Sequence, residues 1–326
     1  MAESTHDVAT KDAGNYQYIK QKLMVLLVGQ IASCMIAGTS IISYTLANEY
    51  NIDMPAMQSF LNYLFLFAIY GSIYCANHSF GTTFRKKWMT YLFLAFVDVE
   101  ANYCIVKAFG YNSLVTVMLF DCATIFFIVL LTMFYLKIRY NWRHFLGIIL
   151  CVVGVSLQAI TGYNKEEGRL IGNFLGILSS ILYAISNIGQ EKVVKDSGIL
   201  EFLAFIGFFG VQISGLQVLA LEHQQILQFR WNWSAVGLFL GFVCFMYVLY
   251  SLTPYIMKFA GSTWFNLSLR TSNGIGAVFE IYVFKKNIYP IYWLFLSIVI
   301  IGLCIYHINK PPKTKNPTRD PQIPAV

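Results

Sequence analysis

Apolar residues in this chain run in long unbroken stretches separated by short polar connectors. The stretches are 17 to 26 residues long and lack the polar–apolar alternation of barrel strands. About 20 apolar residues make a helix that crosses a bilayer with its backbone amides bonded internally. The pattern predicts an all-α polytopic membrane protein with ten transmembrane helices. The predicted spans are residues 22–47, 56–76, 88–109, 112–136, 145–161, 170–190, 199–221, 233–255, 261–284 and 291–307.

Composition and the placement of basic residues extend this prediction. Charged residues make up 12% of the chain, against roughly 25% in soluble domains. The connectors on the side of both termini carry 16 lysines and arginines, and the opposite connectors carry 6. Because basic loops stay in the cytosol, both termini are predicted to be cytosolic. We therefore expect an integral multi-pass protein of the plasma membrane or an endomembrane, surrounded by membrane lipid.

Two segments indicate an internal repeat. Residues 136–157 and 284–305 align at a shift of 148, which places Lys137 on Lys285 and Gly154 on Gly302. A unit of five spans repeats in inverted orientation, because five is odd, and inverted repeats are common in secondary transporters. The predicted organisation is a cytosolic tail (1–21), a first five-helix half (22–161), a non-cytosolic connector (162–169), a second five-helix half (170–308) and a disordered cytosolic tail (309–326).

Four charged residues lie near the middles of predicted spans: Asp98, Glu100, Asp121 and Arg270. Each would oppose insertion by roughly 2.5–3.5 kcal/mol if it faced lipid, so they are expected to face the protein interior or a wet cavity. Asp98 shares a helix face with Asn102, four residues on, while Glu100 points about 160° away. The two acids are therefore expected to serve different environments.

The repeat brings one acid and one base to similar depth. At the 148-residue shift Asp121 falls on Leu269, beside Arg270, so we infer an Asp121–Arg270 pair across a central cavity. Three acids against one base leave an excess of carboxyl groups, and a buried carboxyl without a partner holds its proton. Proton coupling is thus one hypothesis. A structural ion pair that locks helices together is the alternative.

Uncharged polar residues add to the predicted cavity. Asn187 shares a helix face with Tyr183, and Asn273 lies seven residues after Asn266. They are read either as interhelical hydrogen bonds or as the lining of a site for a polar, planar ligand. No Walker loop, HExxH or GxSxG motif is present, so no enzyme activity, cofactor or metal site is predicted. The net charge of +7 is spread over span ends and tails and forms no nucleic-acid-binding face.

Six motifs carry a resemblance to a known family. They are GQIASCMIAGTS (29–40), QSFLNY (58–63), DVEANY (98–103), MLFDCATI (118–125), LYAISN (182–187) and SLTPYIMK (251–258). Together they resemble solute carrier family 35, subfamily F, its F1/F2-like branch, within the drug/metabolite transporter superfamily. The resemblance implies ten helices in two inverted repeats, cytosolic termini, alternating access and a nucleobase-like or nucleotide-derived solute such as queuine or its nucleoside. Arg270 stands where the family commonly has leucine, and Asn273 where it has aspartate.

These observations favour a secondary active transporter for a small polar metabolite of nucleobase or nucleoside type. Its predicted substrate-binding or coupling residues are Asp98, Glu100, Asn102, Asp121, Asn187, Arg270 and Asn273. A Golgi nucleotide-sugar antiporter is the first alternative. The phosphate groups of a nucleotide sugar, however, would require more cationic groups in the cavity than the single Arg270. A non-transporting membrane scaffold or receptor is the second, and it would tolerate neutral replacement of the midspan charges.

Overall fold

The structure, a computed structural model, describes residue 24 and residues 27–135, 142–161, 169–229, 232–285 and 290–308. Regular secondary structure in this part of the chain is helical. Both predicted tails, and the connector up to residue 168, lie outside the described residues. The helices are Leu27–Asn48, α2 (Pro55–Leu66), η1 (Phe67–Gly71), α3 (Ser72–Asn77), α4 (Phe80–Ala108), α5 (Leu114–Asp121), α6 (Ala123–Tyr135), α7 (Trp142–Thr161), α8 (Arg169–Ser197), α9 (Ile199–Gln217), η2 (Val218–Glu222), α10 (His223–Gln228), α11 (Trp233–Ser268), α12 (Thr271–Tyr282) and α13 (Pro290–Ile308).

The described helices agree with a multi-span membrane protein. Seven of them, some built from consecutive helical elements, are long and apolar enough to cross a membrane, and these overlap seven of the ten predicted spans. The other three predicted spans, 145–161, 261–284 and 291–307, overlap α7, α12 and α13. An all-helical polytopic fold is therefore confirmed, while the count of ten spans and the inverted repeat stay predictions.

Some helices extend beyond the predicted spans. The helix α4 begins at Phe80, eight residues before the predicted span 88–109, and α8 continues to Ser197 rather than ending at residue 190. Hydropathy predicts only the apolar part of a helix. The helix itself can continue into polar sequence where polar side chains on successive turns bond to one another. In α8, Lys195 Nζ lies 2.5 Å from Glu191 Oε1 across one turn, a spacing that supports a helix.

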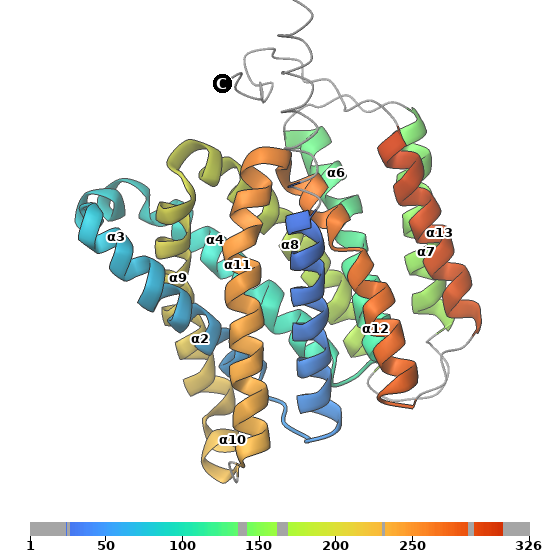
Figure 1. The fold of residues 1–326 in the computed structure, drawn as a ribbon, viewed down its shortest axis with the longest axis horizontal. Coiled ribbons are helices and arrows are strands. Elements are labelled where there is room, and N and C mark those ends of the chain that lie inside the picture. The colour runs from blue at the N-terminus through green and yellow to red at the C-terminus, as the bar shows by residue number, and fades with distance from the viewer. Residues whose placement is uncertain are drawn as a thin grey trace, which may run out of the picture.

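The helices form one bundle with pairs at its two edges (Figure 1). At one edge α7 packs along α13, and at the other α2 packs against α9. The helix α8 contacts α4, α6, α5 and α11, so it joins several parts of the bundle. Elements from both ends of the sequence thus surround a common centre.

Glycines allow the edge pair α2–α9 to pack closely. A Cβ atom added to Gly207 would lie 2.8 Å from the backbone nitrogen of Phe67, and one added to Gly210 would lie 2.5 Å from the ring of Tyr63. Small residues at such contacts let membrane helices approach closely without a hydrophobic driving force from water. This packing fixes the position of Tyr63, which faces the centre of the bundle.

Two helices are interrupted near their middles. The first breaks at Cys122, between α5 and α6. The second starts after Gly261, whose φ of 84° interrupts α11, and breaks at Leu269 and Arg270, before α12. At each break the amide bonds a carbonyl three residues back: Cys122 N to Leu119 O at 3.0 Å, and Ser272 N to Leu269 O at 3.0 Å. Such tight turns inside a span shift the helix axis and turn side chains of both segments toward one point.

Buried glutamates cap the N-termini of helices from other parts of the chain. Glu222, at the end of η2, accepts hydrogen bonds from the amides of Ala56 and Met57 in the first turn of α2, at 2.7 and 2.8 Å. Glu280 of α12 accepts one from the amide of Val115 in α5 at 2.9 Å. A carboxylate satisfies the free amides and the positive end of the helix dipole. Both caps tie late helices to early ones.

Candidate functional site

A cavity of about 110 Å³ lies among the central helices, several times the space that one water molecule requires. It is lined by the N-terminal helix and by α4, α5, α8, α11 and α12, with Leu269 of the α11–α12 break between the last two. Its polar lining consists of Thr39, Ser40, Ser43, Asp98, Asn102, Asp121, Tyr183, Asn187, Gln190, Tyr250, Thr253, Asn266, Ser272 and Asn273. Phenylalanines and aliphatic side chains complete the wall. A cavity with a largely apolar wall, onto which these polar groups converge, suits a small, partly polar ligand.

Asp98 of α4 lies at the centre of a hydroxyl cluster on one wall. Its Oδ2 accepts hydrogen bonds from Tyr63 at 2.8 Å and Tyr250 at 2.6 Å, and its Oδ1 accepts one from Ser186 at 2.9 Å. These donors come from α2, α11 and α8, so a single carboxylate joins four helices. Hydrogen bonds replace the water that the carboxylate loses on burial.

Asn102 continues this cluster one turn further along α4. Its amide nitrogen donates to the hydroxyls of Tyr63 at 3.0 Å and Tyr250 at 2.8 Å, and its amide oxygen accepts from Tyr183 at 3.0 Å. The predicted shared face of Asp98 and Asn102 is therefore present. Both side chains are fixed by several partners before any ligand binds, which is the preorganisation that a binding site requires.

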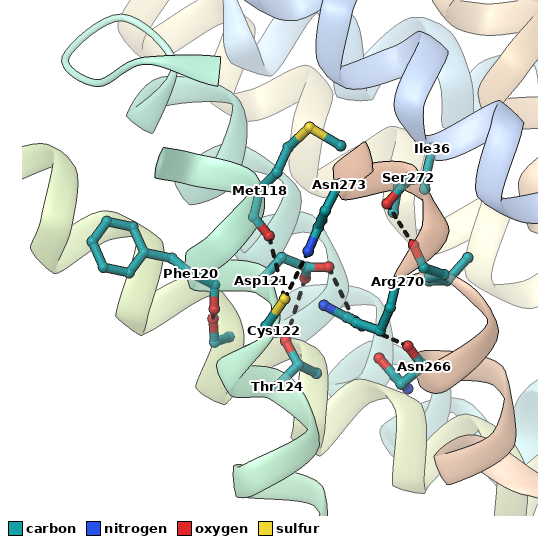
Figure 2. Close-up of polar contacts among 12 residues, drawn as sticks. Ile36, Met118, Phe120, Asp121, Cys122, Thr124, Asn266, Arg270, Ser272 and Asn273 are labelled. Carbon is teal, nitrogen blue, oxygen red and sulfur yellow. Dashed lines mark hydrogen bonds and ion pairs between the residues drawn. The ribbon is translucent and has the colours of Figure 1, made fainter. Parts of the chain in front are cut away.

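The two interrupted helices meet at an ion pair. Figure 2 shows Asp121, at the end of α5, and Arg270, at the break before α12, pointing toward one another. Their Nη2 and Oδ2 atoms are 3.3 Å apart, and Arg270 Nε also donates to the carbonyl of Asn266 at 2.7 Å. Asn273 donates to the sulfur of Cys122 at 2.9 Å. The pair inferred from the sequence is present, with Asp121 on the cavity wall and Arg270 behind it.

A row of polar side chains on α8 faces the cavity. Tyr183, Asn187 and Gln190 follow one another at helical spacing, and all three line the chamber. Asn187 donates to the amide oxygen of Asn266 at 3.3 Å. The row offers hydrogen-bonding groups at successive depths, so it can contact different parts of one ligand.

Glu100 lies apart from the cavity. It does not belong to the cavity lining, and its Oε1 accepts a hydrogen bond from Gln217 of α9 at 2.7 Å. This agrees with the expectation that Asp98 and Glu100 serve different environments. The structure thus brings five of the seven predicted site residues to the cavity wall, Asp98, Asn102, Asp121, Asn187 and Asn273, with Arg270 behind Asp121.

Several cavity or cluster residues were not predicted as site residues. Tyr63 and Tyr250 bind Asp98 directly, Ser186 completes its shell, and Gln190 extends the row on α8. Individual tyrosines carry little signal in a chain with 21 of them. Gln190 was the last residue of a predicted span, where polar residues are ordinary. Its position seven residues after Tyr183 was the available signal.

Fold and cavity together define an integral membrane protein with a polar chamber among its spans, as solute carriers have. The chain belongs to solute carrier family 35, through the SLC35F family, which matches residues 18–308. It is 34% identical over 313 residues to solute carrier family 35 member F2 of Mus musculus, covering 93% of this chain and 83% of that protein. The member F2 of Xenopus tropicalis is 30% identical over 327 residues, covering 95% and 84%.

A solved crystal structure has a similar fold. It matches with a TM-score of 0.60 over 87% of this chain and 96% of its own, at 11% identity. At this identity the likeness concerns the fold alone. Family membership makes the protein a transporter of small-molecule solutes rather than an enzyme.

Proposed function

We propose that this protein is a secondary active transporter that moves a small polar metabolite of nucleobase or nucleoside type by alternating access. The cavity is the observation that carries the proposal. It lies among helices from both parts of the chain, and it is lined by Asp98, Asn102 and Asp121 from the first and by Asn187 and Asn273 from the second. Carrier binding sites occur at such interfaces near the midplane of the bilayer.

The proposed architecture is ten spans in two inverted halves, residues 22–161 and 170–308, with cytosolic termini. The two helix breaks support it. Cys122 and Arg270 are separated by the same 148 residues that align the two halves in sequence, and both breaks adjoin the cavity. Discontinuous helices in corresponding positions of two repeats are typical of secondary transporters. The excess of basic residues on one side supports the orientation.

The charge balance of the cavity favours a cargo without phosphate groups. Arg270 is engaged by Asp121 at 3.3 Å, and the described cavity lining contains no lysine or arginine. Phosphates are bound in proteins by several cationic groups or backbone amides. A nucleotide-sugar antiporter is therefore the less supported alternative. The amides and hydroxyls of the lining suit an uncharged heterocycle.

Asp98 is the proposed carrier of a coupling proton. Within the described chain its hydrogen bonds come from Tyr63, Tyr250 and Ser186, not from a cation. A buried carboxyl of this kind in a membrane protein is a common proton relay. Protonation would remove one acceptor and loosen the tyrosines that join α2 and α11 to α4. Glu100, bonded to Gln217, is a proposed second coupling group outside the cavity.

Uptake by purified protein in proteoliposomes tests the proposal. The panel contains hypoxanthine, adenosine, queuine and UDP-glucose, each with and without an imposed pH gradient. We expect saturable uptake of a base or nucleoside that increases when the gradient is applied. Uptake of UDP-glucose alone would favour the antiporter, and no saturable uptake would favour a scaffold. Uptake that ignores the gradient would reject proton coupling only.

A further inference from the structure

One cavity residue, Gln190, has hydrogen-bonding groups that the protein leaves unused. Its side chain lines the cavity and the residue is 7% exposed. Asn102 and Asn187 in the same chamber bond to other side chains, but Gln190 has no hydrogen-bond partner among the described residues. The amide atoms of Gln190 are not among the fully buried side-chain atoms that lack a partner, so they face the space of the cavity. Its groups are therefore available to whatever fills the cavity.

The neighbours of Gln190 strengthen this interpretation. Asn187, three residues earlier on α8, donates a hydrogen bond from its amide nitrogen to the amide oxygen of Asn266 at 3.3 Å. Tyr183, seven residues earlier, donates its hydroxyl to Asn102 at 3.0 Å. These contacts hold the rest of the row in place, while Gln190 at its end keeps both an acceptor and a donor. Residues at this spacing share one face of a helix.

We propose that Gln190 is a specificity-determining residue that binds a lactam edge of the cargo, meaning an N–H beside a C=O in one ring. Along one edge, a carboxamide presents its oxygen acceptor beside one of its two N–H donors, in a plane. Its complement is a group that presents one donor and one acceptor side by side. This inference rests on the proposed function, since it takes the cavity to be the transport site, and it adds the chemical group that the site selects.

Hypoxanthine and purine are the probes that test this inference, because hypoxanthine has an N1–H beside the C6 carbonyl and purine has neither. Equilibrium binding of each is measured on purified full-length protein. We expect wild type to bind hypoxanthine at least about tenfold more tightly than purine, since a site that bonds a polar group rejects the analogue without it. Gln190→Met, of similar length, should reduce that ratio to about threefold or less by weakening hypoxanthine. Gln190→Leu should reduce the ratio in the same way, and it replaces Gln190→Met in the test if that variant does not fold.

Gln212→Met is the matched control, because Gln212 lies on α9 with an exposed side chain and does not line the cavity. It should keep the wild-type ratio. Equal binding of the two probes by wild type, or binding of neither, overturns the lactam assignment. A ratio retained by folded Gln190→Met or Gln190→Leu overturns the role of Gln190. Saturable uptake of a base or nucleoside would leave the proposed transport function standing in each of these cases.

Discussion

At the scale of single residues, Asp98 is the centre of the site because three hydroxyls from three other helices bond to it. In Asp98→Asn the side chain keeps its shape but loses its negative charge. One of its two oxygens becomes an amide nitrogen, which donates a hydrogen bond and cannot accept one from the hydroxyls that bonded to that oxygen. We expect the rate of uptake to fall at least about tenfold, since hydrogen bonds to a charged group contribute roughly 1.5–3 kcal/mol each.

The same variant tests coupling. Asn cannot take up and release a proton near neutral pH, so any residual uptake by Asp98→Asn should no longer increase with a pH gradient. The measurement is uptake into proteoliposomes with and without the gradient. Glu100→Gln is measured in the same assay, because Glu100 is the second proposed coupling group and lies outside the cavity. A full gradient response in Asp98→Asn would contradict the assignment of the proton to Asp98.

The Asp121–Arg270 pair gives a prediction about stability. In Asp121→Asn the guanidinium of Arg270, with 8% of its side chain exposed, loses the carboxylate that lies 3.3 Å from its Nη2 atom. Removing one partner of a buried pair destabilises by roughly 3–5 kcal/mol. Asp121→Asn combined with Arg270→Leu should recover part of that loss, because neither charge then remains. Thermal unfolding of the two single variants and the double variant measures the coupling. If the stability losses of the two single variants simply add up in the double variant, Asp121 and Arg270 do not stabilise one another.

The sequence predicted the charged and amide residues of the site better than its hydroxyls. Asp98, Asp121 and Asn187 stand out because ionisable and amide groups in apolar stretches are costly. Tyr63 and Tyr250 are amphipathic and common in membrane helices, so their roles depend on which residue they face. That depends on helix packing, which a single span does not specify.

At the scale of elements, helix ends depend on contacts between distant segments. The start of α2 is capped by Glu222, from 165 residues further along the chain, and the start of α5 by Glu280. Local sequence predicted neither cap, because the partners come together only in the folded bundle. For the same reason α4 and α8 continue beyond their apolar stretches.

Replacement of these capping glutamates should destabilise the bundle. Glu222→Gln keeps one acceptor oxygen for the amides of Ala56 and Met57 but loses the charge that favours the helix N-terminus. We expect a loss of about 1–2 kcal/mol, by analogy with N-cap losses, and a lower midpoint in thermal unfolding. Glu49→Gln, at the exposed end of the first helix, is the control and should leave the midpoint unchanged. Equal midpoints for both variants would mean that the cap contributes nothing.

Close packing of α2 and α9 gives a second prediction for elements. In Gly207→Ala the new methyl group would lie 2.8 Å from the backbone nitrogen of Phe67, so the two helices must separate. We expect destabilisation of roughly 1–3 kcal/mol, as for other overpacked cores. Gly237→Ala is the matched control, because no atom lies within 4 Å of its added Cβ. A Gly207→Ala protein as stable as Gly237→Ala would contradict this packing.

At the scale of the whole molecule, the two interrupted helices would provide a physical means for the proposed alternating access. The breaks at Cys122 and Arg270 allow the segments on either side to tilt separately, and the ion pair joins them at the level of the cavity. Sequence anticipated the depth of this junction through the 148-residue shift. It did not predict the breaks, because neither contains proline or glycine.

The contact between α5 and α12 on one side of the breaks must open for transport to occur if this mechanism is correct. A Cβ atom added to Gly276 would lie 2.3 Å from the sulfur of Met118, so these two segments are in tight contact. A disulfide formed by Met118→Cys, on the cavity wall, with Gly276→Cys should abolish turnover, because the link prevents the two segments from separating. Reduction by dithiothreitol should restore uptake by the double variant, and Met118→Cys alone, treated with the same oxidant, should transport throughout. Undiminished uptake by the fully cross-linked protein would mean that α5 and α12 stay together during the cycle, and access would then have to alternate through other helices.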